Sequence, residues 1–238
     1  MYIALSPGVV PEIAERLSCF IALGPSVFSG PVLRRFPFSL MQRFRSRQWW
    51  SLAFGIKAYL PLISLFMKVL PTWLFGHIAA MVFAFIFKFH MNLTPKRILP
   101  KCFRTMPEYT SSELLYWYMS AFANRVRPLP PDHISMLSLT SMFPQGCIFD
   151  PQYKQPWFPF TDPKRKFPPH AVFYGTADTL VIGRPLVERL REYEPHIDIL
   201  RFVELDGYEH LDFMFAHDAW RTTYPGILEC IEASRDIE

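Results

Sequence analysis

The sequence predicts an α/β fold built on a parallel sheet, and three observations support this prediction. Three short apolar segments have the length and composition of buried strands: Ser18–Leu23, Ala171–Tyr174 and Ile199–Val203. A turn follows each segment directly, at Gly24-Pro25, at Gly175 and at Asp206-Gly207. Helical patterns follow the last two segments, and this strand–helix–strand–helix order is typical of parallel sheets.

The helices that accompany these strands can be placed in order along the chain. The segment from Met1 to about Arg16 predicts a helix that is interrupted near Pro7-Gly8. A second helix is predicted over Pro185–Tyr193, because its apolar side chains fall on one face. A third helix is expected near Ala219–Ala233. Three strands alone leave one edge and one face of the predicted sheet without partners.

A long insertion separates the first strand from the second. Residues 30–165 are aromatic, contain helical patterns and are interrupted repeatedly by proline. Half of the 238 residues are hydrophobic, so the chain can bury a core and is not disordered. The sequence predicts three parts: a first core segment over 1–29, a helical hydrophobic cap over 30–165 and a C-terminal core segment over 166–238.

One run of this insertion, Val69–Phe87, has 19 residues without a formal charge and lies between Lys68 and Lys88. This length meets the lower limit for a helix that crosses a bilayer. Pro71 and His77 favour instead a helix that is buried in the cap or lies at an interface. Both interpretations stay open, and the first predicts a non-catalytic, membrane-associated protein with one hydrophobic span.

The net charge is only +4, but basic residues are clustered. Five arginines fall within fourteen residues, beside several aromatic side chains: Arg34, Arg35, Arg43, Arg45 and Arg47. Such a mixture is compatible with an anionic membrane surface or with a solvated basic segment. Nucleic acid is the weakest interpretation, because no nucleic-acid-binding motif accompanies the cluster.

The four cysteines, Cys19, Cys102, Cys147 and Cys230, are widely spaced and form no Cys-x-x-Cys motif. Cys19 lies in an apolar run and is expected in the core, whereas a disulfide among the others stays open. No cluster of His, Cys and carboxylates has the spacing of metal ligands, and no glycine-rich phosphate loop occurs. The sequence therefore implies neither a metal nor an organic cofactor.

Residues that can carry chemistry follow two of the predicted strands. Asp178 follows the second strand, and His210 follows the third. The carboxyl ends of parallel strands meet at one edge of a sheet, so these side chains are expected to lie close together. The carboxylate can orient the imidazole, which can then act as a general base toward a hydroxyl. Three further carboxylates flank His210 and are alternative partners, of which the last is expected to shape the loop: Asp206, Glu209 and Asp212.

On these residues the sequence resembles the α/β-hydrolases, and among them the fungal-type acid lipases and steryl-ester hydrolases. Phe173–Asp178 is similar to the family's Gly-x-x-Asp acid loop, and Tyr208–Phe213 to its histidine loop. The segment from Tyr2–Ser6 through Phe20–Pro25 is similar to the helix after the nucleophile and the next strand, and Tyr116-Trp117-Tyr118 lies where such lipases have an aromatic cap helix. The resemblance implies a partial α/β-hydrolase fold and a hydrophobic ester or lipid substrate. It also implies that Asp178 and His210 are the acid and base of a Ser-His-Asp triad.

The nucleophile motif of that family is missing. Its serine lies in Gly-x-Ser-x-Gly, and no such pentapeptide occurs here, since Gly24–Phe28 fails at its last position. The resemblance puts the motif just upstream of Met1, so we expect a truncated serine ester hydrolase that is inactive as given. A truncated gene product without a function of its own is the remaining interpretation. The apolar run and the resemblance together predict association with an endomembrane or a lipid-droplet surface.

Overall fold

The computed structural model describes residues 16–28, 30–41, 46–55, 68–105, 112, 116 and 167–235. The chain divides into two compact units, one formed by Met1–Gly30 with Leu139–Glu238 and the other by Pro31–Ser138. The first unit contains the sheet, and the second contains the helices of the predicted cap. Several predicted features lie outside the described residues: the helix over residues 1–15, Arg43, Arg45, Trp117, Tyr118, Cys147 and the domain boundary at 165–166.

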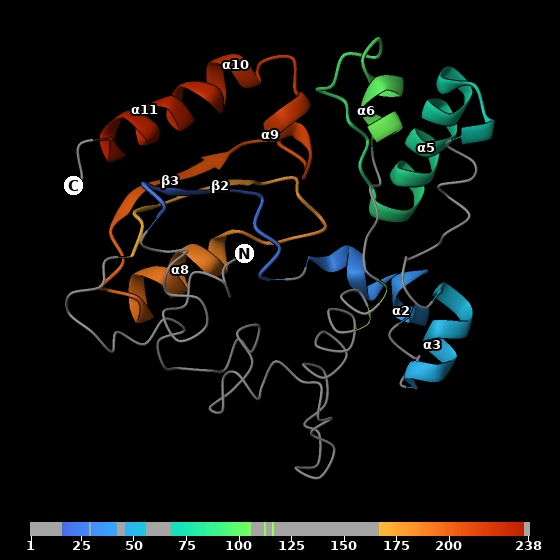
Figure 1. Cartoon of the computed structure of the whole chain (residues 1–238), viewed down its shortest axis with the longest axis horizontal. Coiled ribbons are helices and arrows are strands. Elements are labelled where there is room, and N and C mark those ends of the chain that lie inside the picture. The colour runs from blue at the N-terminus through green and yellow to red at the C-terminus, as the bar shows by residue number, and fades with distance from the viewer. Residues whose placement is uncertain are drawn as a thin grey trace. The chain divides into compact units, whose positions relative to one another are not determined.

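Three parallel strands form the sheet of the first unit: β1 (Phe20–Leu23), β2 (His170–Gly175) and β3 (Ile199–Leu205). β2 lies between the other two (Figure 1). Its first four residues are all buried, as a continuous apolar run requires of a central strand. The α/β prediction is therefore confirmed, and the second and third strands extend further than expected, to Gly175 and Leu205.

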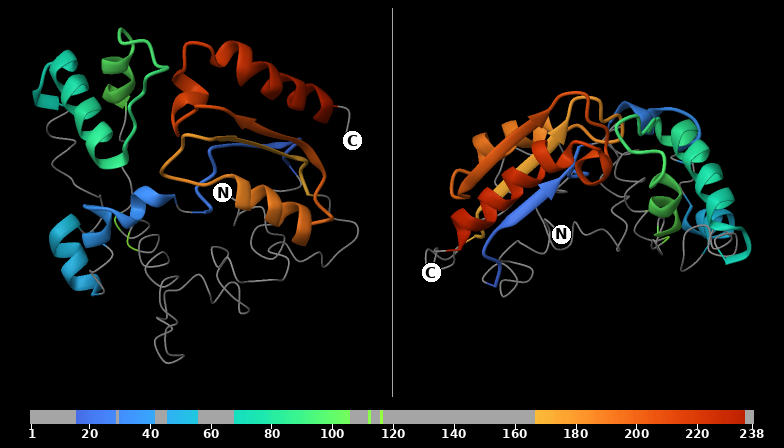
Figure 2. Two further views of the ribbon diagram at one scale, coloured as in Figure 1. Left: turned by 180° about the vertical axis from the view of Figure 1, so that it is seen from behind. Right: turned by 90° about the horizontal axis from the view of Figure 1, so that it is seen from above.

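Helices cover both faces of this sheet, so the expectation that one face lacks partners is wrong (Figures 1 and 2). On one face, α8 (Arg184–Tyr193) packs its buried leucines into a core that includes Val172 of β2. On the other face, α11 (Tyr224–Ser234) comes so close that a Cβ on Gly226 would lie 3.1 Å from the Phe173 ring. Neighbouring residues of a strand point to opposite faces, so β2 contributes to the core on both sides of the sheet.

The predicted helix near Ala219–Ala233 is divided in the structure. α10 (Ala219–Thr222) ends before α11 begins at Tyr224, and Pro225 lies in the first turn of α11. Proline has no N–H and its ring clashes with the carbonyl four residues earlier, which excludes one continuous helix. The short helix α9 (Asp212–Phe215) precedes both.

Two cysteines can be compared with expectation. Cys19, which was expected in the core, is only partly buried, because it precedes β1 instead of lying within it. Cys230 of α11 is buried, and both residues are free thiols.

The described part of the second unit is helical. Its elements are η2 (Pro31–Arg34), α2 (Phe38–Met41), α3 (Arg47–Phe54), α5 (Thr72–Phe87) and α6 (Leu99–Thr105). Aromatic side chains pack α5 against α6, since the Phe83 ring of α5 lies 4.9 Å from the Phe103 ring of α6, and it also lies 5.0 Å from Phe87 of its own helix. Trp50 is buried and donates its indole N–H to Ser112 Oγ at 3.0 Å, which satisfies its polar atom in the core.

The apolar run Val69–Phe87 is not one helix. A bend at Leu70 and the following Pro71 interrupt it, and α5 takes only the last 16 residues. No helix in the described ranges is long and apolar enough to cross a membrane, so the predicted span is not supported.

Candidate active site

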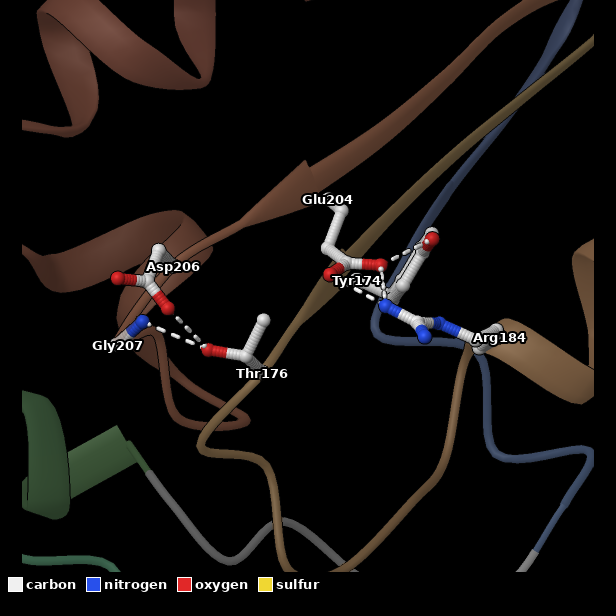
Figure 3. A network of polar contacts seen from close by, with 6 residues as sticks. All are labelled: Tyr174, Thr176, Arg184, Glu204, Asp206 and Gly207. Carbon is white, nitrogen blue, oxygen red and sulfur yellow. Dashed lines mark hydrogen bonds and ion pairs between the residues drawn. The ribbon is translucent and has the colours of Figure 1, made fainter.

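The carboxyl ends of β2 and β3 place two loops side by side: the acid loop, residues 175–181, and the histidine loop, residues 206–212. Thr176 Oγ1 donates to Asp206 Oδ1 at 2.9 Å and accepts the Gly207 N–H, also at 2.9 Å (Figure 3). These hydrogen bonds join the loops at the edge where parallel α/β sheets bind ligands.

The missing side chain of Gly175 lets the two loops approach closely. A Cβ on this residue, the last of β2, would lie 2.1 Å from the Tyr208 carbonyl oxygen. That oxygen accepts the Ala177 N–H at 3.2 Å. Any side chain at position 175 would displace backbone two residues before His210, so this glycine sets the spacing between the loops.

Asp178 and His210 are hydrogen-bonded to each other. His210 Nδ1 lies 2.8 Å from Asp178 Oδ2, and the two side chains are 19% and 2% exposed, respectively. An ionised carboxylate can only accept, so Nδ1 is the donor when Asp178 is ionised, and in the neutral form of that imidazole Nε2 then has the lone pair. The predicted proximity of these side chains is confirmed, while their catalytic role stays a prediction.

The second oxygen of Asp178 fixes the orientation of the carboxylate. Oδ1 accepts the backbone N–H groups of Leu180 at 2.9 Å and of Val181 at 3.0 Å. One oxygen therefore bonds to its own loop and the other to His210. A carboxylate held in this way favours a single tautomer and ring orientation of the imidazole.

The segment after β1 supports the acid loop. Gly30 donates its N–H to the Leu180 carbonyl at 2.7 Å, and Ile182 donates to the Phe28 carbonyl at 2.9 Å. A Cβ on Gly30 would lie 2.1 Å from the Thr179 carbonyl oxygen, so a larger residue would force the two segments apart. No local pattern predicts this contact, because its partners are distant in the sequence.

Gly24, directly after β1, lies against the imidazole of His210. Its φ is +54°, and a Cβ there would stand 3.2 Å from His210 Nδ1 and 3.3 Å from the Phe213 ring. Its N–H donates to the Phe173 carbonyl at 2.9 Å, which extends the pairing of β1 with β2. The sequence predicts this glycine only as a turn residue, whereas in the structure its backbone lies in contact with the His210 side chain.

Two of the carboxylates that flank His210 bond elsewhere. Asp212 Oδ2 accepts the Glu209 N–H at 2.8 Å, which confirms that Asp212 shapes the loop. Asp206 accepts the Thr176 hydroxyl. Burial raises the pKa of Asp212, and nearby carboxylates including Glu209 raise it further, although the Glu209 N–H opposes this shift.

Tyr208 connects the histidine loop to α10. Its hydroxyl donates to Asp218 Oδ1 at 2.9 Å and forms a short hydrogen bond with Thr222 Oγ1. The side chain is buried, and its ring centroid lies 5.8 Å from that of Phe213. Both the main chain and the side chain of Tyr208 therefore hold the loop that carries His210.

A second polar cluster lies further down the strands (Figure 3). Glu204 of β3 accepts the Tyr174 hydroxyl at 2.7 Å and Arg184 Nη2 at 2.8 Å. The hydrogen bonds from Tyr174 and Arg184 lower the pKa of Glu204. This exposed cluster joins β2, β3 and α8, but solvent screening makes its contribution to stability small.

The arrangement can perform proton transfer. The lone pair on His210 Nε2 can take a proton from a hydroxyl placed within hydrogen-bond distance, and the Asp178 carboxylate would stabilise the imidazolium that forms. In the described residues, no group of three or more His, Cys, Asp and Glu side chains could hold a metal ion.

Comparison with known proteins gives one relative that bears on the site. The chain is similar to sterol esterase 2 of Saccharomyces cerevisiae, with 25% identity over 230 residues, which cover 87% of this chain. The chain spans 39% of the length of that relative. No family model matches the chain. The similarity supports a relationship to hydrolases of the lipase and esterase type.

Proposed function

We propose that this chain is the part of a serine ester hydrolase that supplies the acid and the base of its triad. Asp178 is the acid and His210 the base, acting on a hydrophobic carboxylic ester. The observation that carries the proposal is the 2.8 Å hydrogen bond between His210 Nδ1 and Asp178 Oδ2. The similarity to an esterase supports the same reaction class.

The proposed chemistry has two proton transfers. His210 Nε2 accepts the proton of a serine hydroxyl as the oxygen attacks the ester carbonyl, and a tetrahedral intermediate forms. The same proton then passes from Nε2 to the leaving alcohol when the intermediate collapses to an acyl-enzyme. Water repeats the sequence and releases the acid. Asp178 stays ionised throughout and stabilises the imidazolium.

The proposed substrate class follows from the chemistry of the chain and from its relative. The second unit is apolar and aromatic, as the binding site for a water-insoluble acyl chain requires. The relative is named for sterol esters, so a sterol ester is the first substrate to try.

The serine is the missing component. No Gly-x-Ser-x-Gly occurs in the 238 residues, so we propose that they do not hydrolyse esters without a nucleophile from elsewhere. Loss of the serine in a triad costs on the order of 10⁶-fold in rate. The purified chain should therefore hydrolyse a p-nitrophenyl ester no faster than its His210→Ala variant. Activity that is lost in His210→Ala would refute the missing-nucleophile proposal but support the base.

A chimera tests the roles of Asp178 and His210 in turnover. The segment of sterol esterase 2 that aligns with this chain is replaced by the chain, and hydrolysis of a sterol ester is measured. Asp178→Asn should lower kcat by about 10⁴-fold. His217→Ala, at an exposed histidine of the same segment, is the matched control and should leave kcat unchanged. A folded, active chimera that tolerates His210→Ala contradicts the proposal.

A second measurement needs no nucleophile and no chimera. In the chain labelled with ¹⁵N-histidine, the His210 resonances should report a proton on Nδ1 at neutral pH. In Asp178→Asn the amide oxygen still accepts the backbone N–H groups of the acid loop, so the NH₂ group faces Nδ1. An NH₂ group can only donate, so the proton of His210 should move to Nε2. A His210 tautomer that does not respond to Asp178→Asn would show that the two side chains are not coupled.

A further inference from the structure

We propose that the exposed face of α5 docks on a bilayer surface that contains anionic phospholipids. This inference concerns the second unit and does not depend on ester hydrolysis.

The first observation is an apolar helix face that is open to solvent. Phe75, Gly76 and Ala79 of α5 are buried, and a Cβ on Gly76 would lie 2.3 Å from Pro100 Cα in α6. Five large apolar side chains of α5 are exposed instead: Trp73, Ile78, Met81, Val82 and Phe85. Three of them, spaced by multiples of four residues, are 63%, 65% and 65% exposed, respectively: Trp73, Met81 and Phe85. Monomeric soluble proteins rarely expose an apolar patch of this kind without a binding partner.

The second observation is the charge of the surrounding sequence. Residues 31–107 contain no Asp or Glu and twelve basic residues: Arg34, Arg35, Arg43, Arg45, Arg47, Lys57, Lys68, Lys88, Lys96, Arg97, Lys101 and Arg104. Each Lys or Arg near an anionic leaflet adds to the attraction. A segment with one sign of charge fits a surface of the opposite sign.

The two features adjoin in the structure. Lys88 directly follows α5, and its ammonium lies 5.5 Å from the centre of the Phe85 ring. Lys68 is exposed before the other end of α5. Lys101 is exposed on α6, the helix that packs against α5. Basic side chains therefore lie near both ends of the apolar helix and on its neighbour, where an anionic bilayer surface would attract them.

The geometry of α5 suits this position. The helix has 16 residues without a charge, which is about 24 Å at 1.5 Å per residue. Trp73, near its start, has the amphipathic ring that is enriched at the headgroup level of bilayers. A second copy of the chain is a poorer occupant, because pairing along α5 would bring the basic residues of both copies close together.

Vesicle flotation of the full chain tests the proposal. The chain should float with phosphatidylcholine vesicles that contain about 30% phosphatidylserine, and binding should fall at about 0.5 M salt. The triple variant Trp73→Ser, Met81→Ser, Phe85→Ser should lower the partition coefficient at least tenfold. A matched triple variant, Trp220→Ser, Leu228→Ser, Ile231→Ser, removes exposed apolar side chains of α10 and α11 and should bind like the wild type.

Four outcomes would overturn the proposal. In the first, the wild-type chain stays at the bottom of the gradient with anionic vesicles; in the second, it binds neutral vesicles equally well. In the third, the α5 triple variant binds as tightly as the wild type, and circular dichroism shows that both are folded. In the fourth, sedimentation finds a dimeric wild type and a monomeric triple variant, so that α5 holds two copies together.

Discussion

The Cα of Gly24 lies against the imidazole of His210, so that a methyl group there would stand 3.2 Å from Nδ1. This contact links the end of β1 to the histidine loop, although the two are distant in the sequence. Gly24 thus limits where the imidazole can lie, while Asp178 determines how it is oriented. The backbone of one strand and the carboxylate of another together fix the base.

Gly24→Ala is expected to lower the free energy of unfolding by about 2 kcal/mol. About 1 kcal/mol comes from an L residue at positive φ, and the rest comes from the tight contact with His210. Gly207→Ala is the matched control, because its φ is +71° but a Cβ there meets nothing within 4 Å. Urea unfolding measures both variants, and equal losses would contradict a role for the His210 contact.

Asp178→Ala is expected to lower the free energy of unfolding by about 2–4 kcal/mol. It removes the acceptor of two backbone N–H groups, on Leu180 and Val181, and leaves them without that partner near the protein interior. Asp178→Asn keeps an amide oxygen for these donors and should lose only about 1 kcal/mol. If chemical denaturation gives the same loss for both variants, the acid loop does not depend on Oδ1.

Asp212 allows a similar comparison of an amide with an alanine substitution. Its folded pKa is raised, mainly by burial, so the folded state binds the proton more tightly than the unfolded state. The stability that protonation confers is lost as the pH rises through the unfolded and then the folded pKa.

Asp212→Asn should therefore be neutral or stabilising at pH 7, by up to about 1 kcal/mol, because the amide oxygen can still accept the Glu209 N–H. Asp212→Ala should destabilise by about 1–3 kcal/mol, because that N–H loses its acceptor. Thermal unfolding at pH 7 separates the two, and a strongly destabilised Asp212→Asn would show that the buried charge is needed.

Much of the sheet and the central pair of the site could be predicted from the sequence. β1, β2 and β3 are short apolar runs that end in turns, and parallel pairing follows from the helices between the last two. Asp178 and His210 could be paired because each follows a strand, and parallel strands bring such loops to one edge.

The contacts that hold the pair could not be predicted. Gly24, Gly30 and Gly175 matter because backbone from another segment occupies the space of a side chain, and only coordinates show this. The division of the last helix was missed although Pro225 was visible, because an apolar periodicity continues across it. In the cap, the length of the uncharged run suggested a span, but Pro71 starts the helix later.

His170 is predicted to make the stability of the folded protein depend on pH in the acid range. Its side chain is fully buried at the start of β2, its Nδ1 bonds to the Pro168 carbonyl at 2.6 Å, and its ring lies 5.2 Å from Phe20. Burial lowers the pKa of His170 to about 4; the Pro168 carbonyl opposes this shift, and the electrostatic interaction with His196 adds to it. In the unfolded chain the His170 imidazole binds a proton below about pH 6.5, whereas in the folded chain it binds one only below about pH 4.

Stability should therefore fall as the pH drops from about 6.5 to 4, by on the order of 3 kcal/mol from this group. His170→Gln removes the titrating group, so its free energy of unfolding should change less over this range than that of the wild type, even if it is lower at pH 7. His217→Gln, at an exposed position, controls for the loss of one histidine. Urea unfolding between pH 7 and 4 measures the difference in slope. Parallel curves for wild type and His170→Gln would contradict this prediction, because they would mean that the buried site at the start of β2 accommodates the charged imidazole.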